Sequence, residues 1–100
     1  MTDTIFARSS GAPPAAIAIV RISGPAATDT LRQIAGEVPE PRRMSLRKLT
    51  NPADGTVLDQ ALVVHFPAAQ SATGEDQVEL HLHGGRAVVD AVEAVLGGIP

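Results

Sequence analysis

One short alternating segment carries the side chains of this sequence that are best suited to chemistry. In the segment QVELHLH, residues 77–83, three polar side chains recur at every second position: Glu79, His81 and His83. Because successive side chains of a β-strand point to opposite faces, a strand here places these three on one face and the valine and two leucines between them on the other. The apolar face suits a protein core, so the polar face can meet a solute or an ion.

Three interpretations of this polar face are open. A glutamate with a His-x-His pair can supply three metal ligands, as zinc requires, although no fourth ligand with suitable spacing stands out. A dyad of Ser71 or Thr73 with His81 could activate a nucleophile, but the preceding segment SATGED is better explained as a loop whose polar side chains bond local backbone. The third interpretation is an ordinary strand with one exposed face.

A second unusual residue is Arg21, which shares its strand face with Ile17 and Ile19 in the segment AIAIVRI. A guanidinium on an apolar face needs a carboxylate, backbone carbonyls or an anionic ligand, because an unpaired buried charge costs several kcal/mol. It can also reach water from the strand end or pair with a structural acid. The same alternatives apply to Glu79. Together, one cation and one carboxylate on two strands could cradle a polar heterocycle that carries an acidic tail.

Composition limits the size and class of the protein. One hundred residues make one domain at most, and the two phenylalanines leave the core to Ala, Val, Ile and Leu. Eight basic and eleven acidic residues give a net charge of −3, which argues against a self-sufficient nucleic-acid surface. The chain has no cysteine, no signal-peptide pattern and no run of about 18 apolar residues, so we expect a soluble cytoplasmic protein without membrane contact.

Periodicity and turn residues predict an α/β (α+β) domain with a mixed β-sheet and packed helices. A helix is expected to begin with Pro25 as its first residue and to end at Gly36, and the segment NPADG to form a hairpin turn. The expected strands cover residues 4–10, 15–22, 44–50, 56–66 and 77–83, and the expected helices residues 25–36 and 86–98. Residues 15–22 are mostly apolar, which favours a strand buried on both faces.

Longer stretches of the chain resemble a known family. The motifs RISGP, DGTVLDQ, TGED and HGG occur in this order, within DTIFARSSG, AIAIVRISGP and residues 41–85. In this combination they resemble the N-terminal domain of the MnmE (TrmE) family of tRNA modification GTPases, and the likeness covers nearly all of residues 1–100. The resemblance implies a fold like that of tetrahydrofolate-binding aminomethyltransferases, incomplete at its C-terminal side.

The resemblance also implies a function. In this family the N-terminal domain binds 5-formyl-tetrahydrofolate or a related reduced folate as one-carbon donor and forms a homodimer. The full proteins continue into helical and G domains, and with the FAD-dependent partner MnmG they add an aminomethyl or carboxymethylaminomethyl group to C5 of wobble uridine 34 in tRNA. GTP, K+ and Mg2+ belong to the G domain. The present residues contain no G-x-x-x-x-G-K-[ST] loop, so we expect no GTPase activity from this chain alone.

The family's folate contacts fall on Arg21 in RISG and Glu79 in DQVE. A carboxylate can accept two parallel hydrogen bonds from a pterin, and the planar arginine fork suits a ligand carbonyl or carboxylate. We expect His81 and His83 to be wall residues and not metal ligands, no catalytic residue in this chain, and a further family lysine beyond position 100. Ala72 and Leu82 depart from the usual aromatic and cysteine. The alternatives are a purely structural dimerisation module and a small metal-dependent hydrolase using Glu79, His81 and His83.

Overall fold

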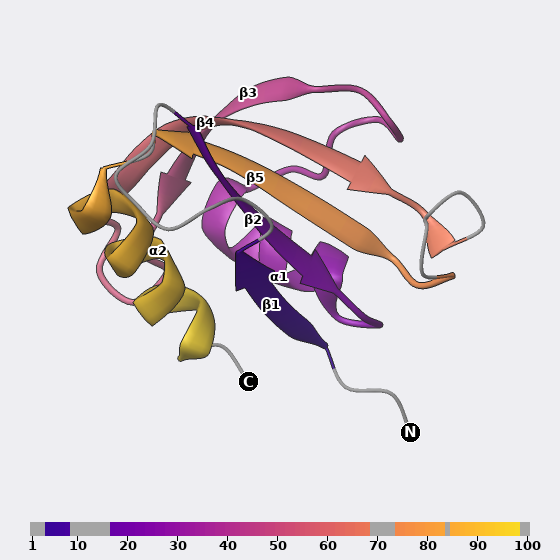
Figure 1. Ribbon diagram of the computed structural model, residues 1–100, viewed down its shortest axis with the longest axis horizontal. Coiled ribbons are helices and arrows are strands. Elements are labelled where there is room, and N and C mark those ends of the chain that lie inside the picture. Colours follow the sequence, from indigo (N-terminus) through magenta and orange to yellow (C-terminus); the bar gives the residue numbers. More distant parts are fainter. Residues whose placement is uncertain (1–3, 9–16, 69–73, 84, 99–100) are drawn as a thin grey trace.

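The computed structural model describes residues 4–8, 17–68, 74–83 and 85–98, which form five strands and two helices (Figure 1). The elements are β1 (Ile5–Arg8), β2 (Ile17–Ser23), α1 (Ala27–Ala35), β3 (Ser45–Thr50), β4 (Val57–Phe66), β5 (Gln77–His83) and α2 (Arg86–Gly97). The α+β class and the order of elements agree with the prediction. No helix in these ranges is long and apolar enough to cross a membrane.

The strands form one sheet in the order β1-β2-β5-β4-β3, so that β3 and β1 are its edges at the top and bottom of Figure 1. All four strand pairs within the described part of the chain are antiparallel, and the expectation of a mixed sheet was therefore wrong. A parallel neighbour needs a crossover connection. Here α1 carries the chain past two strands to the far edge, and the chain then returns through two antiparallel neighbours, β4 and β5.

The core lies between one face of the sheet and the two helices. Alternate residues of the strands are fully buried there, as expected for β5 from its apolar positions: Ala18, Val20, Ile22, Ala61, Val63, Val78, Leu80 and Leu82. Helix α1 packs on β3 and β5, and α2 packs on β4 and β5. Their buried side chains are Ala27, Thr30, Leu31 and Ile34 in α1, and Val89, Val92 and Leu96 in α2. Burying each Val, Leu or Ile stabilises the fold by about 1.5–3 kcal/mol before entropy is counted.

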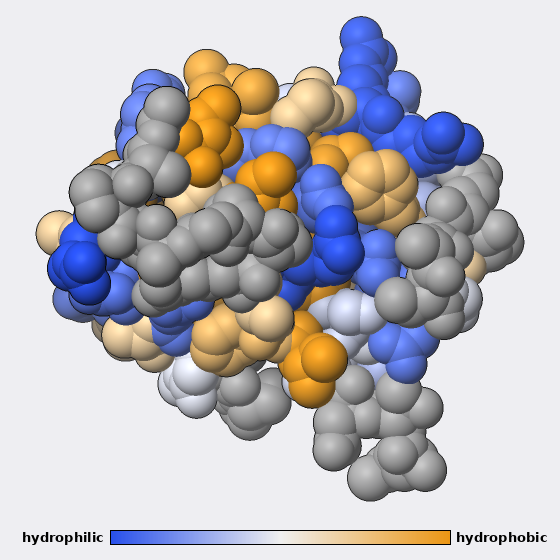
Figure 2. Space-filling view, in the orientation of Figure 1, coloured by the Kyte–Doolittle hydropathy of each residue, from blue (hydrophilic) through white to orange (hydrophobic). Residues whose placement is uncertain are grey.

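The other face of the sheet has no helix of the described ranges packed on it. Strand β2 therefore alternates in burial, with Ile17 55% exposed and Ala18 fully buried. The expected burial of this strand on both faces was wrong, because its β-branched composition fits a pleated surface whether one face or two are covered. Figure 2 shows hydrophobic and hydrophilic residues side by side on the side of the molecule seen in Figure 1.

Three local predictions, one for a turn and two for the ends of a helix, can be compared with the structure. The hairpin between β3 and β4 is confirmed, with Gly55 at a φ of 76° and the Asn51 side chain accepting a hydrogen bond from the Ala53 N–H at 2.9 Å. Gly36 ends α1 at a φ of 88°, as expected for a glycine cap. Pro25 is not the first helical residue: α1 begins at Ala27, and Ala26 is its N-cap, with a φ of −98°, a ψ of 10° and an N–H that donates to Thr4 Oγ1 at 2.7 Å.

Candidate functional site

The sheet face opposite the helices brings the predicted site residues together, and we call it the open face. It is formed by alternate residues of three strands: Ile17, Ile19 and Arg21 of β2, Leu62 and Val64 of β4, and Glu79, His81 and His83 of β5. The strand register sets these side chains in rows. Arg21, Glu79 and Val64 are direct neighbours in one row, and Ile19, His81 and Leu62 in the next.

The centre of the open face is an ion pair between Arg21 and Glu79. The guanidinium donates to one carboxylate oxygen, Oε2, from Nη2 at 2.7 Å and from Nε at 3.2 Å. The arginine side chain is 42% exposed and the glutamate side chain 16% exposed. Of the partners that Arg21 was expected to need, the structure shows a carboxylate, that of Glu79, so the two residues expected to form one cradle on two strands are in direct contact.

The second carboxylate oxygen of Glu79 is also occupied. His81 Nε2 lies 3.1 Å from Oε1, and its side chain is 18% exposed. Burial of the Glu79 carboxyl raises its pKa, but the hydrogen bonds from Arg21 and His81 outweigh burial and leave this pKa below its ordinary value. The carboxylate is therefore charged, and Nε2 of His81 must carry the proton that joins them. Sequence reasoning placed His81 on the right face without assigning it this hydrogen bond.

His83 does not join this cluster. Its ring nitrogen Nδ1 lies 2.8 Å from Asp59 Oδ1, and its backbone N–H donates to Asp59 Oδ2 at 2.9 Å. No group of three His, Cys, Asp or Glu side chains within the described ranges could hold a metal ion. The Glu79, His81 and His83 set of the hydrolase alternative is thus divided between two separate pairs.

Asp59 is the residue that sequence reasoning missed. Its side chain is only 9% exposed, although it comes from a strand that alternates apolar and polar residues. The available signal was an acid inside the segment VLDQALVV, where an unpaired carboxylate would be costly. Its partner could not be named from the sequence, because His83 lies 24 positions away on a neighbouring strand.

Residues 74–76, directly before β5, form hydrogen bonds to the end of β2 and to the residues after β4. Gly74 has a φ of 78°, a backbone conformation that glycine adopts easily, and Asp76 accepts a hydrogen bond from the Ala68 N–H at 2.9 Å. Ser23 donates to Glu75 at 3.0 Å. Ser71, Ala72 and Thr73 lie outside the described residues, so the nucleophile alternative and the departure at Ala72 have no structural outcome.

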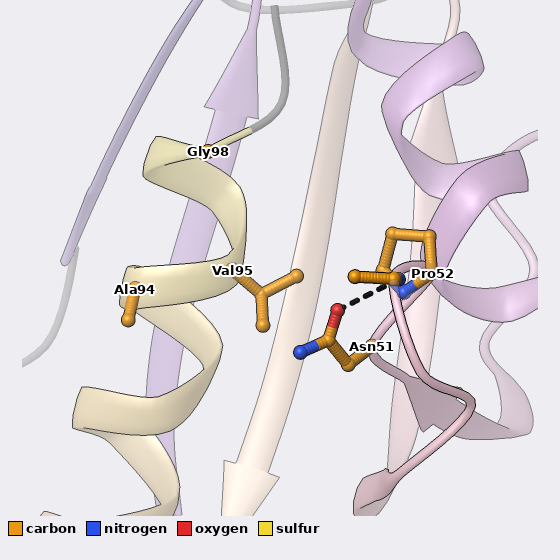
Figure 3. A pocket seen from close by; sticks show the side chains of 6 residues that line it. Asn51, Pro52, Ala94, Val95 and Gly98 are labelled. Carbon is orange, nitrogen blue, oxygen red and sulfur yellow. Dashed lines mark hydrogen bonds between the residues drawn. The ribbon is translucent and has the colours of Figure 1, made fainter.

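A shallow depression of about 300 Å³ lies away from these charged residues, between the β3–β4 turn and the end of α2. It is lined by Asn51, Pro52, Ala53, Ala94, Val95 and Gly98. Figure 3 shows Val95 and the Asn51 amide facing one another across it. Asn51 is engaged with its own turn, and the lining holds no ionisable side chain, so the depression lacks the groups that chemistry would need.

The fold and site define a small α+β domain in which one sheet face is core and the other presents an arginine–glutamate–histidine cluster. Residues 4–98 match the family model described as the GTP-binding protein TrmE N-terminus. The chain belongs to this family.

Relatives support the same assignment. The chain is 58% identical over 100 residues to the tRNA modification GTPase MnmE of Novosphingobium aromaticivorans, covering 100% of this chain and 23% of that protein. It is 58% identical over 98 residues to the MnmE of Methylorubrum populi, covering 98% of this chain and 22% of the relative. For the MnmE of Zymomonas mobilis the identity is 54% over 98 residues, with 97% and 23% covered. The chain thus spans less than a quarter of the length of these relatives.

Proposed function

We propose that this chain is the folate-binding and dimerising part of a tRNA modification GTPase, and that its open face binds 5-formyl-tetrahydrofolate or a related reduced folate. The observation that carries the proposal is the ion pair of Arg21 and Glu79 on a sheet face with no helix of the described ranges over it. A fully exposed ion pair contributes little to stability, and a fully buried pair pays a large desolvation penalty. This one is half-buried among apolar side chains, where a flat polar ring can lie against it.

A folate that binds to the Glu79 carboxylate must share or replace its present hydrogen bonds with Arg21 and His81. A pterin offers two parallel donors, a ring N–H and an exocyclic amino group, which fit the two oxygens of one carboxylate. Oε1 is now held by His81, and Oε2 by Arg21. A carboxylate has about four lone-pair positions, so the ligand can share Oε1 with His81 while Arg21 turns toward a ligand carbonyl. The 42% exposure of the Arg21 side chain leaves room for this rotation.

The names of the relatives support the wider role. They are tRNA modification GTPases, and the family model that this chain matches describes the N-terminus of such proteins. In the full protein, GTP hydrolysis with K+ and Mg2+ belongs to a G domain outside residues 1–100. The folate held here supplies the one-carbon unit for the aminomethyl group at C5 of uridine 34, in cooperation with an FAD-dependent partner of the MnmG type.

A separate observation favours a second candidate function, that of a purely structural dimerisation module. Large apolar side chains on strands of the open sheet are exposed, among them Ile17 at 55%, Leu46 at 58% and Leu62 at 40%. Such residues on one face favour contact with a second copy of the chain. The two candidates are compatible if two copies meet around the ligand, and they differ in whether the chain binds folate at all.

The test is a calorimetric titration of 5-formyl-tetrahydrofolate into this chain and into a longer form that continues past Pro100. We expect saturable binding that is weakened by Glu79→Gln and unaffected by Glu37→Gln, a matched change at an exposed glutamate after α1. Binding of equal strength in the wild type and Glu79→Gln would overturn the folate proposal. Absence of binding in both forms, with self-association retained, would favour the structural module.

A further inference from the structure

Asp59 of β4 and His83 of β5 are joined by two hydrogen bonds. Oδ1 of Asp59 lies 2.8 Å from Nδ1 of the His83 ring, and Oδ2 accepts a hydrogen bond from the His83 backbone N–H at 2.9 Å. The carboxylate is 9% exposed, whereas the histidine side chain is 74% exposed. A side chain this exposed would ordinarily sample several rotamers. Here a nearly buried acid fixes the orientation of a ring that faces solvent.

This arrangement determines which ring atom meets a ligand. An ionised Asp59 can only accept, so Nδ1 of His83 carries a proton and donates to Oδ1. Nε2 makes no hydrogen bond to another residue in the described ranges. A carboxylate behind a histidine is the usual way in which proteins fix the tautomer of an imidazole that works on a ligand. When Nε2 is also protonated, Asp59 balances the added charge, and Nε2–H can donate to an anion.

The position of His83 relates it to the Arg21–Glu79 pair. His83 lies four residues after Glu79 on the same face of β5, which corresponds to about 13 Å along a strand. Between them lies the row of Ile19, His81 and Leu62. In the opposite direction from Glu79, the chain leads to two acids, Glu75 and Asp76. The acid at the other end, Asp59, has both oxygens bonded to His83, so an anionic group is better placed beside His83 than beside Glu75 and Asp76.

We infer that His83, oriented by Asp59, binds the acidic tail of the folate whose pterin pairs with Glu79. This rests on the proposed function. A reduced folate is a long molecule with hydrogen-bond donors on its pterin, an aromatic ring in its middle and carboxylates at its end. The open face offers, in the same order, the carboxylate of Glu79, the Ile19–His81–Leu62 row and Nε2 of His83, which donates to a carboxylate when the imidazole carries both protons. His83 contacts the ligand, and Asp59 is a positioning residue.

The experiment compares two ligands by calorimetry. One is 5-formyl-tetrahydrofolate, and the other is the corresponding 5-formyl-tetrahydropterin without the aminobenzoylglutamate tail. We expect His83→Ala to weaken binding of the complete folate about three- to tenfold, the size of a partly exposed charged hydrogen bond, and to leave binding of the pterin unchanged. Asp59→Asn should weaken folate binding in the same direction. Arg32→Ala, at an exposed cation on α1, is the control for a general loss of positive charge.

A second measurement separates positioning from support of the fold. Nitrogen-15 NMR of the neutral imidazole in the free chain should show the Nδ1–H tautomer of His83 in the wild type and a mixture of tautomers in a folded Asp59→Asn variant, and binding of the complete folate should add a proton at Nε2 of the wild type. If the wild type binds no folate, both the proposed function and this inference fail. If Glu79→Gln weakens binding while His83→Ala leaves folate affinity intact, or weakens both ligands equally, the tail contact alone is wrong.

Discussion

The two faces of the sheet come from the same strands but respond to different demands. On the helix side, every inward residue of β5 is fully buried and apolar, and each contact is interchangeable with others of its kind. On the open face, Glu79, His81 and His83 of the same strand are charged or titratable, and each bonds to specific side chains. Loss of a side chain should therefore reduce stability on the first face and recognition on the second.

The largest expected effect is a contrast between two leucines on adjacent strands. Leu80→Ala opens a cavity in the core and should lower the free energy of unfolding by about 2–5 kcal/mol. Leu62→Ala, on the open face at 40% exposure, should cost less than about 1 kcal/mol at concentrations where the chain is monomeric. Urea denaturation followed by circular dichroism measures both. Equal losses would mean that the open face is covered in solution.

The next contrast concerns ligand affinity. Glu79→Gln keeps the size of the side chain but turns one acceptor into a donor that faces the donors of a pterin. Folate binding should weaken by about 2–3 kcal/mol, or roughly 30- to 150-fold. The matched Leu80→Val change in the core should leave affinity within about twofold when the variant is folded. The opposite ranking of these two variants in the titration would contradict the division between the faces.

Self-association should depend on the open face and not on exposed apolar residues in general. Leu62→Glu places a charge beside the exposed Leu46 in the next strand and should weaken a dimer at least about tenfold. Val57→Glu, at the start of β4 and 56% exposed, is the control. Sedimentation equilibrium gives both values. A wild type that stays monomeric at high concentration, in a form extended past Pro100, would remove the dimer proposal.

Arg21→Lys tests the shape of the cation and not its charge. Lysine cannot reproduce the two donors that now reach Glu79 Oε2, nor the planar fork toward a ligand carbonyl. We expect folate binding to weaken about five- to tenfold and the fold to lose less than about 1 kcal/mol. If Arg21→Lys binds as tightly as the wild type, the arginine serves only as a counter-ion.

The smallest effect is a dependence of stability on pH. The pKa of Glu79 is lower in the folded chain than its ordinary value of 4.5, so the folded state favours the charged carboxylate. Its contribution is fully present above about pH 4.5 and is lost as the pH falls through the folded pKa. The difference in unfolding free energy between wild type and Glu79→Gln should therefore be constant near pH 7 and shrink in acid. A difference that grows below pH 4.5 would mean the opposite shift.

The sequence predicted what local pattern controls. Alternation assigned the two faces of β5 correctly, and the turn residues located the β3–β4 hairpin and the end of α1. Strand order could not be predicted in this way, because the choice of neighbours depends on which helix crossing packs best. The sequence grouped Arg21 with Glu79 as contacts of one ligand, but their direct ion pair across 58 positions and the pairing of Asp59 with His83 were not predicted, because local patterns carry no information on which distant residues touch. The alternation of polar and apolar residues predicts which side chains share a sheet face, but not which residues of other strands they bond to.

The pairing of β2 with β5 has a consequence for how the chain folds. The β3–β4 hairpin joins near neighbours and can form on a timescale of about 1–10 μs. The central pair joins residues 17–23 to residues 77–83 and must first close a loop of more than half of the chain. Such non-local pairing makes folding slow, in the range of about milliseconds to seconds. Arg21 and Glu79 meet only when β2 pairs with β5. A chain that has formed only the β3–β4 hairpin therefore has no binding site. A ligand that needs both Arg21 and Glu79 binds only chains that have finished folding.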